Sequence, residues 1–177
     1  SNHHLNLTEK DLDLFSVRGW HTFTIYRDPR DIMCSLYHYG QKLIRNKKDC
    51  PGAPFHSQGV LAGHLGKGLW IPPDVTCLSL SECLVQLVER PELNRFWEFP
   101  EYMKRLDFVL PNTEPGFKSF LSSMGLKFKP HRRVNESGNP GYLFLEPTLS
   151  RQARECLRGS RKLRAALDYY ESILSQI

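Results

Sequence analysis

The stretch of sequence that decides the fold is Arg27-Asp28-Pro29-Arg30-Asp31-Ile32-Met33-Cys34-Ser35. It follows a short apolar segment at residues 22–26, which is typical of a β-strand. Asp28 can cap a helix that begins at Pro29, because the first helical position needs no amide hydrogen. Asp31 comes three residues after Asp28, as in an acidic variant of a capping box. The sequence therefore predicts a strand at 22–26 that leads directly into a helix at 29–46.

A strand that runs into the start of a helix is suited to bind an anion. The free amides and the dipole of the helix attract negative charge. Arg27 stands at the junction and offers forked donors, and Ser35 adds a hydroxyl two turns into the helix. These two residues are the predicted anion-binding pair. The alternative is an ordinary capped helix with a surface arginine.

The same residues resemble the 3′-phosphate-binding motif of sulfotransferases that use 3′-phosphoadenosine-5′-phosphosulfate (PAPS). In that family an arginine ends a strand and a serine lies eight residues further on, as Arg27 and Ser35 do here. The family's intervening run and its following S-x-Y-H-[YF] run are matched by Asp28-Pro29-Arg30-Asp31 and by Ser35-Leu36-Tyr37-His38-Tyr39. The resemblance implies that Arg27 and Ser35 bind PAPS and that 3′-phosphoadenosine 5′-phosphate is the product.

Weaker matches to the same family follow in order along the chain. They are Phe108-Val109-Leu110 with Glu114, then Arg133-Val134-Asn135-Glu136-Ser137, then Asp168-Tyr169-Tyr170-Glu171. The implied fold is α/β, a P-loop NTPase-like parallel sheet flanked by helices, in one sulfotransferase-like domain over 1–177. Arg132 and Arg133 lie in a basic, glycine-containing loop, and the resemblance implies that they close over the 3′-phosphate or the adenine. A solvated pair is the alternative.

One part of the family's site has no counterpart in the sequence. Sulfotransferases bind the 5′-phosphosulfate with a K-[ST]-[GA]-[ST]-T loop, and no such run precedes Arg27. Gly66-Lys67-Gly68 follows the phosphate helix and lacks the hydroxyl residues. We therefore expect a C-terminal portion of the domain, incomplete at its N-terminal side, inactive alone and partnered by the missing N-terminal half. The alternative is a non-catalytic nucleotide-binding or assembly module that retains only the 3′-phosphate half-site.

The resemblance also implies a catalytic base. In the family a histidine somewhat over twenty residues before the arginine often removes the proton of the acceptor. His4 lies 23 residues before Arg27 and is followed by leucine, as in the family. A frayed terminus is the alternative, and His64 is a second candidate. The implied reaction transfers a sulfuryl group to a hydroxyl or amine of a small-molecule or carbohydrate acceptor, whose pocket the long loop region at 47–75 would shape.

Composition is consistent with a globular protein that binds anions. The chain has 177 residues, 40% of them hydrophobic, a formal net charge of +5 and a pI of about 9.0. Its basic residues do not form a single stripe, so nucleic acid is not an expected partner. No segment approaches the roughly 18 apolar residues of a membrane span. The five cysteines contain no C-x-x-C pair, so no metal site is expected and a reducing, cytoplasmic setting is the default, with the Golgi lumen as the alternative.

The remaining elements are predicted from caps and hydrophobic periodicity. Ser79 and Glu82 form a capping box that starts a helix ended by Pro91, and Thr113 caps a helix that Gly125 ends. A break at Gly159 separates the last two helices. The predicted helical ranges are 5–18, 80–89, 92–105, 114–124, 148–158 and 160–176, and a second strand is predicted at 106–110.

Overall fold

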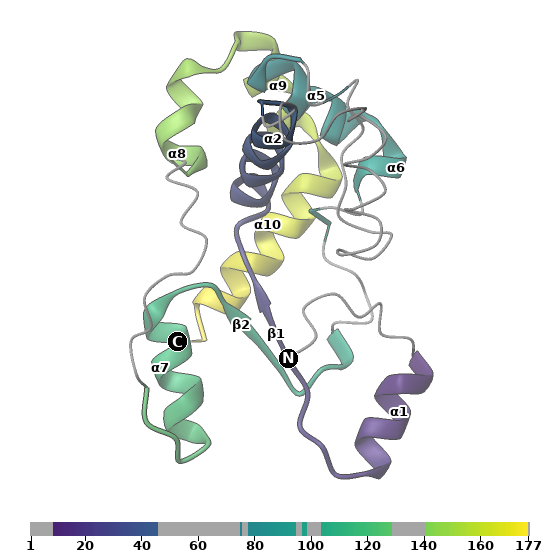
Figure 1. Ribbon diagram of the computed structural model, residues 1–177, viewed down its shortest axis with the longest axis vertical. Coiled ribbons are helices and arrows are strands. Elements are labelled where there is room, and N and C mark those ends of the chain that lie inside the picture. The colour runs from purple at the N-terminus through teal and green to yellow at the C-terminus, as the bar shows by residue number, and fades with distance from the viewer. Residues whose placement is uncertain are drawn as a thin grey trace.

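A computed structural model describes residues 9–45, 75, 78–94, 97–98, 104–128 and 141–176 (Figure 1). These residues combine helices with a small parallel sheet, which agrees with the α/β class. The elements are α1 (Glu9–Val17), β1 (Phe23–Tyr26), α2 (Pro29–Arg45), α5 (Leu80–Glu89), α6 (Pro91–Asn94), β2 (Phe108–Pro111), α7 (Glu114–Ser123), α8 (Tyr142–Leu145), the 3-10 helix η3 (Glu146–Thr148), α9 (Arg151–Gly159) and α10 (Arg161–Leu174).

The sheet consists of β1 and β2, which pair in parallel with Phe23 opposite Phe108 and Tyr26 opposite Pro111. Each strand is followed within three residues by a helix, α2 after β1 and α7 after β2. Because parallel strands end at the same edge, both helices begin at that edge. β1 lies within the predicted 22–26 strand. β2 begins later than predicted, because the carboxylate of Asp107 accepts a hydrogen bond from the Thr22 amide (2.7 Å) just before the pairing starts.

Helices lie on both faces of the strand pair. On one face, Phe120 of α7 contacts the rings of Phe23 and Phe108, with centroids 5.2 and 5.1 Å apart. On the other, Tyr26 contacts Tyr170 of α10 at 6.1 Å. Phe23 and Tyr26 are an odd number of residues apart on one strand, so their side chains point to opposite faces. The sheet is therefore the middle of three layers.

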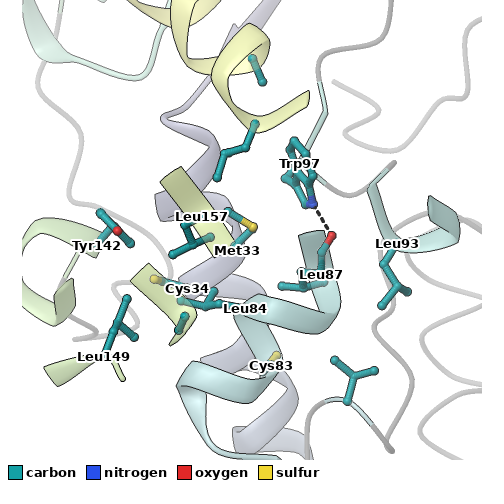
Figure 2. Close-up of a cluster of buried hydrophobic side chains, with 14 residues drawn as sticks. Met33, Cys34, Cys83, Leu84, Leu87, Leu93, Trp97, Tyr142, Leu149 and Leu157 are labelled. Atoms are coloured by element: carbon teal, nitrogen blue, oxygen red, sulfur yellow. Dashed lines mark hydrogen bonds between the residues drawn. The ribbon is translucent and has the colours of Figure 1, made fainter. Parts of the chain in front are cut away.

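The main hydrophobic core lies beyond the sheet, around α2. Figure 1 shows α2, α5 and α9 gathered at one end of the molecule, and Figure 2 shows the buried side chains that they contribute. The carbonyl of Leu87, near the end of α5, accepts hydrogen bonds from the Trp97 indole (2.8 Å) and the Asn94 side-chain amide (3.0 Å). Burial raises the pKa of the thiols of Cys34 and Cys83 to about 12, so both stay protonated within this core.

Local capping and glycine signals set several element ends. The Ser79–Glu82 capping box is formed, with the Ser79 amide 2.9 Å from the Glu82 carboxylate, and α5 spans the predicted 80–89. Gly125 ends α7 with φ of +69°, a conformation that glycine adopts without strain. α5 ends before Pro91, as predicted, and Pro91 then begins the short helix α6. The break between the last two helices was predicted at Gly159 and falls one residue later, at Ser160, whose side chain caps α10. α8 was not predicted.

No helix in the described ranges is long and apolar enough to cross a membrane. The predicted loop region at 47–75 lies outside the described residues except for Val75, which is buried.

Candidate functional site

The start of α2 is built as the sequence predicted. β1 ends at Tyr26, two residues link it to the helix, and Pro29 is the first helical residue. The carboxylate of Asp28 accepts a hydrogen bond from the Arg30 amide at 2.8 Å, so Asp28 caps α2. One amide expected to be free for an anion is therefore already taken. An anion at this end of α2 must be bound largely by side-chain donors.

Arg30, the second arginine of the motif, is held by the protein itself. Its guanidinium contacts Asp28 through Nε (3.0 Å) and Nη2 (2.6 Å), and its Cζ lies 4.9 Å from the ring centroid of Tyr142. The hydrogen bonds that Arg30 donates to the Asp28 carboxylate are the main reason that the pKa of Arg30 is raised. The side chain of Arg30 is only 28% exposed and that of Asp28 only 16%. Arg30 therefore has a structural role at the junction of α2 and α8.

Asp31 also has a role that the sequence did not reveal. Instead of completing a capping box, its Oδ1 accepts a hydrogen bond from the Tyr142 amide at 2.7 Å, across 111 residues of sequence. A Cβ at Gly141 would lie 3.0 Å from that oxygen, so a glycine permits the close approach. The contact ties the first turn of α2 to the start of α8. Gly141 and Tyr142 therefore lie beside the candidate site.

Arg27 and Ser35 differ from their neighbours. Both side chains are partly exposed. Within the described part of the chain, neither the Arg27 guanidinium nor the Ser35 hydroxyl has a hydrogen-bond or ion-pair partner. Ser35 lies about 9 Å along the helix axis from Pro29, at a rise of about 1.5 Å per residue. Arg27 would therefore extend along α2 for both to bind one phosphate.

Tyr170 of α10 belongs to the same region, and the sequence analysis assigned it no role. Its ring contacts Tyr26, whose own hydroxyl donates to the carbonyl of Trp97 at 3.1 Å. Burial is the first cause of the raised pKa of Tyr170; Asp28 and Asp31 raise it further, whereas Arg27 and Arg30 oppose the rise. The raised pKa means that the Tyr170 hydroxyl stays protonated at neutral pH and can donate a hydrogen bond. The sequence held one indication of this position: Tyr170 lies three residues before Ile173 on α10, and Ile173 is buried beside Tyr26.

The second helix start at this edge is also capped by its own chain. Thr113 Oγ1 accepts a hydrogen bond from the Gly116 amide at 3.2 Å. A Cβ at Gly116 would lie 2.9 Å from Pro111, so α7 approaches the end of β2 closely. Asn112 is exposed between the two strand ends, and its amide donates to the Tyr26 carbonyl at 2.9 Å. The start of α7 thus adds polar groups at this edge of the sheet.

Three of the five predicted site residues lie outside the described residues: His4, Arg132 and Arg133. So do the weaker candidates His64 and Lys67. The structure therefore describes only Arg27 and Ser35 of the predicted set, and it adds Tyr170 to them. Within the described ranges, no group of three or more His, Cys, Asp or Glu side chains could hold a metal ion.

Similarity to known proteins does not extend this picture. The chain was compared with models of known protein families, with curated proteins and with solved structures, and none of them matches. Any function assigned to the chain therefore rests on the start of α2 and on the residues gathered around it.

Proposed function

We propose that this protein is a PAPS-dependent sulfotransferase domain of the P-loop NTPase-like α/β class, in which Arg27 and Ser35 bind the 3′-phosphate of the donor. The observation that carries the proposal is a parallel strand that leads directly into a 17-residue helix, with Arg27 at the junction. Arg27 and Ser35 both have donors that the described residues leave unused. Their neighbours Asp28, Arg30 and Asp31 are each engaged in a structural contact.

The proposed role of each phosphate-binding residue follows from its charge and its position. Arg27 supplies charge-assisted hydrogen bonds to the phosphate, and Ser35 supplies a neutral one. Tyr170 donates a third from α10. The positive end of the α2 dipole favours the same charge. Because Asp28 is paired with Arg30, its carboxylate repels the phosphate less than an unpaired one would.

The loop at 129–140 is proposed to add Arg132 and Arg133. Support comes from its end point, since Gly141 is fixed against Asp31 in the first turn of α2. Arg133 precedes Gly141 by eight residues, which span at most about 29 Å when fully extended. The two arginines are therefore within reach of a phosphate beside Arg27.

In the proposed reaction, the acceptor hydroxyl or amine attacks the sulfur of PAPS. The bond from sulfur to the bridging oxygen breaks, and 3′-phosphoadenosine 5′-phosphate leaves. His4 would take the proton of the acceptor, because a neutral imidazole is present near neutral pH. Charge develops on the bridging oxygen as the bond breaks, and the phosphosulfate loop of the N-terminal half would stabilise it.

Binding of 3′-phosphoadenosine 5′-phosphate, measured by calorimetry, tests the proposal. Arg27→Ala should weaken binding by about 1.5–3 kcal/mol, because it removes a charge-assisted contact. Ser35→Ala and Tyr170→Phe should each cost less, since each removes a neutral donor. Arg18→Ala is the matched control, because Arg18 is an exposed arginine next to α1. Unchanged affinity in both the Arg27 and the Ser35 variant would disprove the proposed site.

A second candidate function is a non-catalytic nucleotide-binding or assembly module. One observation favours it: the donors found in the described site suit the 3′-phosphate, and none is placed for the sulfuryl group. The two functions differ in turnover. A protein that binds 3′-phosphoadenosine 5′-phosphate through Arg27, but in its longest natural form transfers no sulfuryl group to any acceptor, would be such a module.

A further inference from the structure

One of the densest groups of basic residues in the chain lies near its C-terminus. Residues 151–164 contain six basic residues and one acidic residue. The resulting formal charge of +5 equals that of the entire chain, so the rest of the sequence is balanced. We refer to the six as the basic cluster: Arg151, Arg154, Arg158, Arg161, Lys162 and Arg164.

The basic cluster lies on the outer side of α9 and on the first turn of α10. α9 buries Ala153 and Leu157 against the core; Arg151 and Arg158 are exposed, whereas Arg154 is half-buried. The side chains of Arg151 and Arg158 are 87% and 74% exposed. The three cations of α10 stand at the start of the helix, where the helix dipole disfavours positive charge. Two of them also make contacts within the protein: Arg164 donates a hydrogen bond to the Arg158 carbonyl at 2.9 Å, and Lys162 lies 3.7 Å from the Glu98 carboxylate.

Two large apolar side chains stand exposed beside the cluster. Leu143 and Phe144, here called the apolar pair, are 75% and 82% exposed on α8. α8 continues into η3, whose first residue, Glu146, lies two residues after Phe144. The Glu146 carboxylate contacts the Arg158 guanidinium at 3.4 Å. This contact joins the chain segment that carries the apolar pair to α9 at Arg158.

Both parts of this surface are fixed to the core. The Tyr142 amide donates to Asp31 of α2, and the Ser150 amide donates to Ser81 of α5 at 2.9 Å. The adjoining Tyr142 and Leu149 are buried. The apolar pair is thus held outward on a rigid support.

We propose that the basic cluster and the apolar pair form a surface that docks on an anionic lipid bilayer. A soluble polyanion would account for the cations but not for two exposed apolar side chains next to them. A bilayer accounts for both, because anionic headgroups attract arginine and lysine, and the interface accepts leucine and phenylalanine. The attachment is peripheral. It does not depend on the proposed sulfotransferase activity, because the surface uses none of the candidate site residues.

Co-sedimentation with vesicles tests this docking. The protein should bind vesicles that mix phosphatidylcholine with phosphatidylserine, and should not bind vesicles of phosphatidylcholine alone. The variant Arg151→Gln/Arg154→Gln/Arg161→Gln should bind the mixed vesicles about 100-fold more weakly, since each removed cation contributes to attraction. Leu143→Ser/Phe144→Ser should bind about tenfold more weakly. Added salt should weaken binding of the wild-type protein.

Matched controls separate this surface from general charge and hydrophobicity. Lys10→Gln/Arg18→Gln/Lys127→Gln removes three exposed cations elsewhere, and Val17→Ser/Leu126→Ser removes two exposed apolar side chains elsewhere. Both should bind the mixed vesicles like the wild-type protein. Circular dichroism checks that each variant folds, and Arg161→Glu alone replaces the triple variant if that one does not.

Three results would overturn the proposal. One is equal binding to vesicles with and without phosphatidylserine. Another is unchanged binding by both the cluster and the apolar-pair variants. The third is binding of poly-L-glutamate or duplex DNA through the basic cluster without vesicle binding, which would assign the surface to a soluble polyanion.

Discussion

At the scale of single residues, the two arginines of the motif have different roles. Arg27 and Arg30 are three residues apart, but only Arg30 is paired, by two contacts with Asp28 and one with the ring of Tyr142. The difference follows from where the chain changes from strand to helix. Arg30 lies in the first turn of α2, next to its own cap, whereas Arg27 precedes the helix.

This difference predicts opposite effects on stability and binding. Arg30→Ala should lower the free energy of unfolding by about 1.5–3 kcal/mol, because it leaves the partly buried Asp28 unpaired. Arg27→Ala should change it by less than about 0.5 kcal/mol, because no contact in the described structure is lost. Urea unfolding monitored by circular dichroism measures both. An Arg27 variant as destabilised as the Arg30 variant would contradict the proposed division.

The two core cysteines predict a pH dependence. Burial raises the pKa of Cys34 and Cys83 to about 12, and in the unfolded chain thiols ionise near about 8.5. The unfolded state therefore binds fewer protons above that pH, and stability falls as pH rises. Between about pH 9 and 12, each thiol should contribute a loss of about 1.4 kcal/mol per pH unit.

Comparison of the wild-type protein with Cys83→Ala isolates this contribution. Both proteins lose stability at high pH through other groups, but the variant should show the smaller slope in urea unfolding. Equal slopes would mean that the Cys83 thiol is not as shielded from water as its buried position indicates.

At the scale of elements, most helix ends follow from contacts within a few residues. The capping box of α5 and the Thr113 cap of α7 are examples. The start of α2 is different, because Asp31 connects it to α8, far along the chain. This link brings the C-terminal segment back to the candidate site.

The Asp31–Tyr142 link can be tested by two variants of Asp31. Asp31→Ala should lower the free energy of unfolding by about 1–3 kcal/mol, because the amide of a buried residue loses its acceptor. Asp31→Asn should cost less, because its side-chain oxygen still accepts. Amide hydrogen exchange at Tyr142 should accelerate in the alanine variant and much less in the asparagine variant. If the exchange rate of the Tyr142 amide is unaltered in both variants, the hydrogen bond between Tyr142 and Asp31 does not hold α8 to α2.

At the scale of the whole molecule, the proposed reaction needs more parts than the candidate site contains. The candidate site lies where β1, β2, α2 and α10 meet, and Gly141 and Tyr142 lie beside it. The proposed phosphosulfate loop and acceptor base lie elsewhere. In the proposed function, the described residues supply only the residues assigned to the 3′-phosphate, Arg27 and Ser35.

The 177-residue chain alone should therefore show no transfer of radiolabelled sulfate from PAPS to any acceptor. Turnover by the chain alone would contradict this expectation and would direct attention to Lys67. In an active, longer form, His4→Ala should lower turnover by about 10²–10⁴-fold, the usual contribution of a general base, with unchanged donor affinity. Normal turnover in that variant would exclude His4, and His64 would be tested next.

The sequence by itself determined the elements whose signals are local. The strand at 22–26, the proline that starts α2, the α5 capping box and the end of α7 at Gly125 each depend on residues within about four positions. The prediction that Arg27 and Ser35 form a binding pair likewise depends on their local spacing along one motif.

Only the tertiary structure decided which distant residues meet. In the folded chain, β1 pairs in parallel with β2, about 85 residues further along the sequence. The Asp31 carboxylate accepts a hydrogen bond from the Tyr142 amide instead of completing a capping box. The tertiary structure also brought Tyr170 to the motif and left Leu143 and Phe144 exposed beside a basic helix. The physical reason is that helix ends are set by hydrogen bonds to near neighbours, whereas strand pairing and side-chain burial depend on segments that the linear sequence keeps apart.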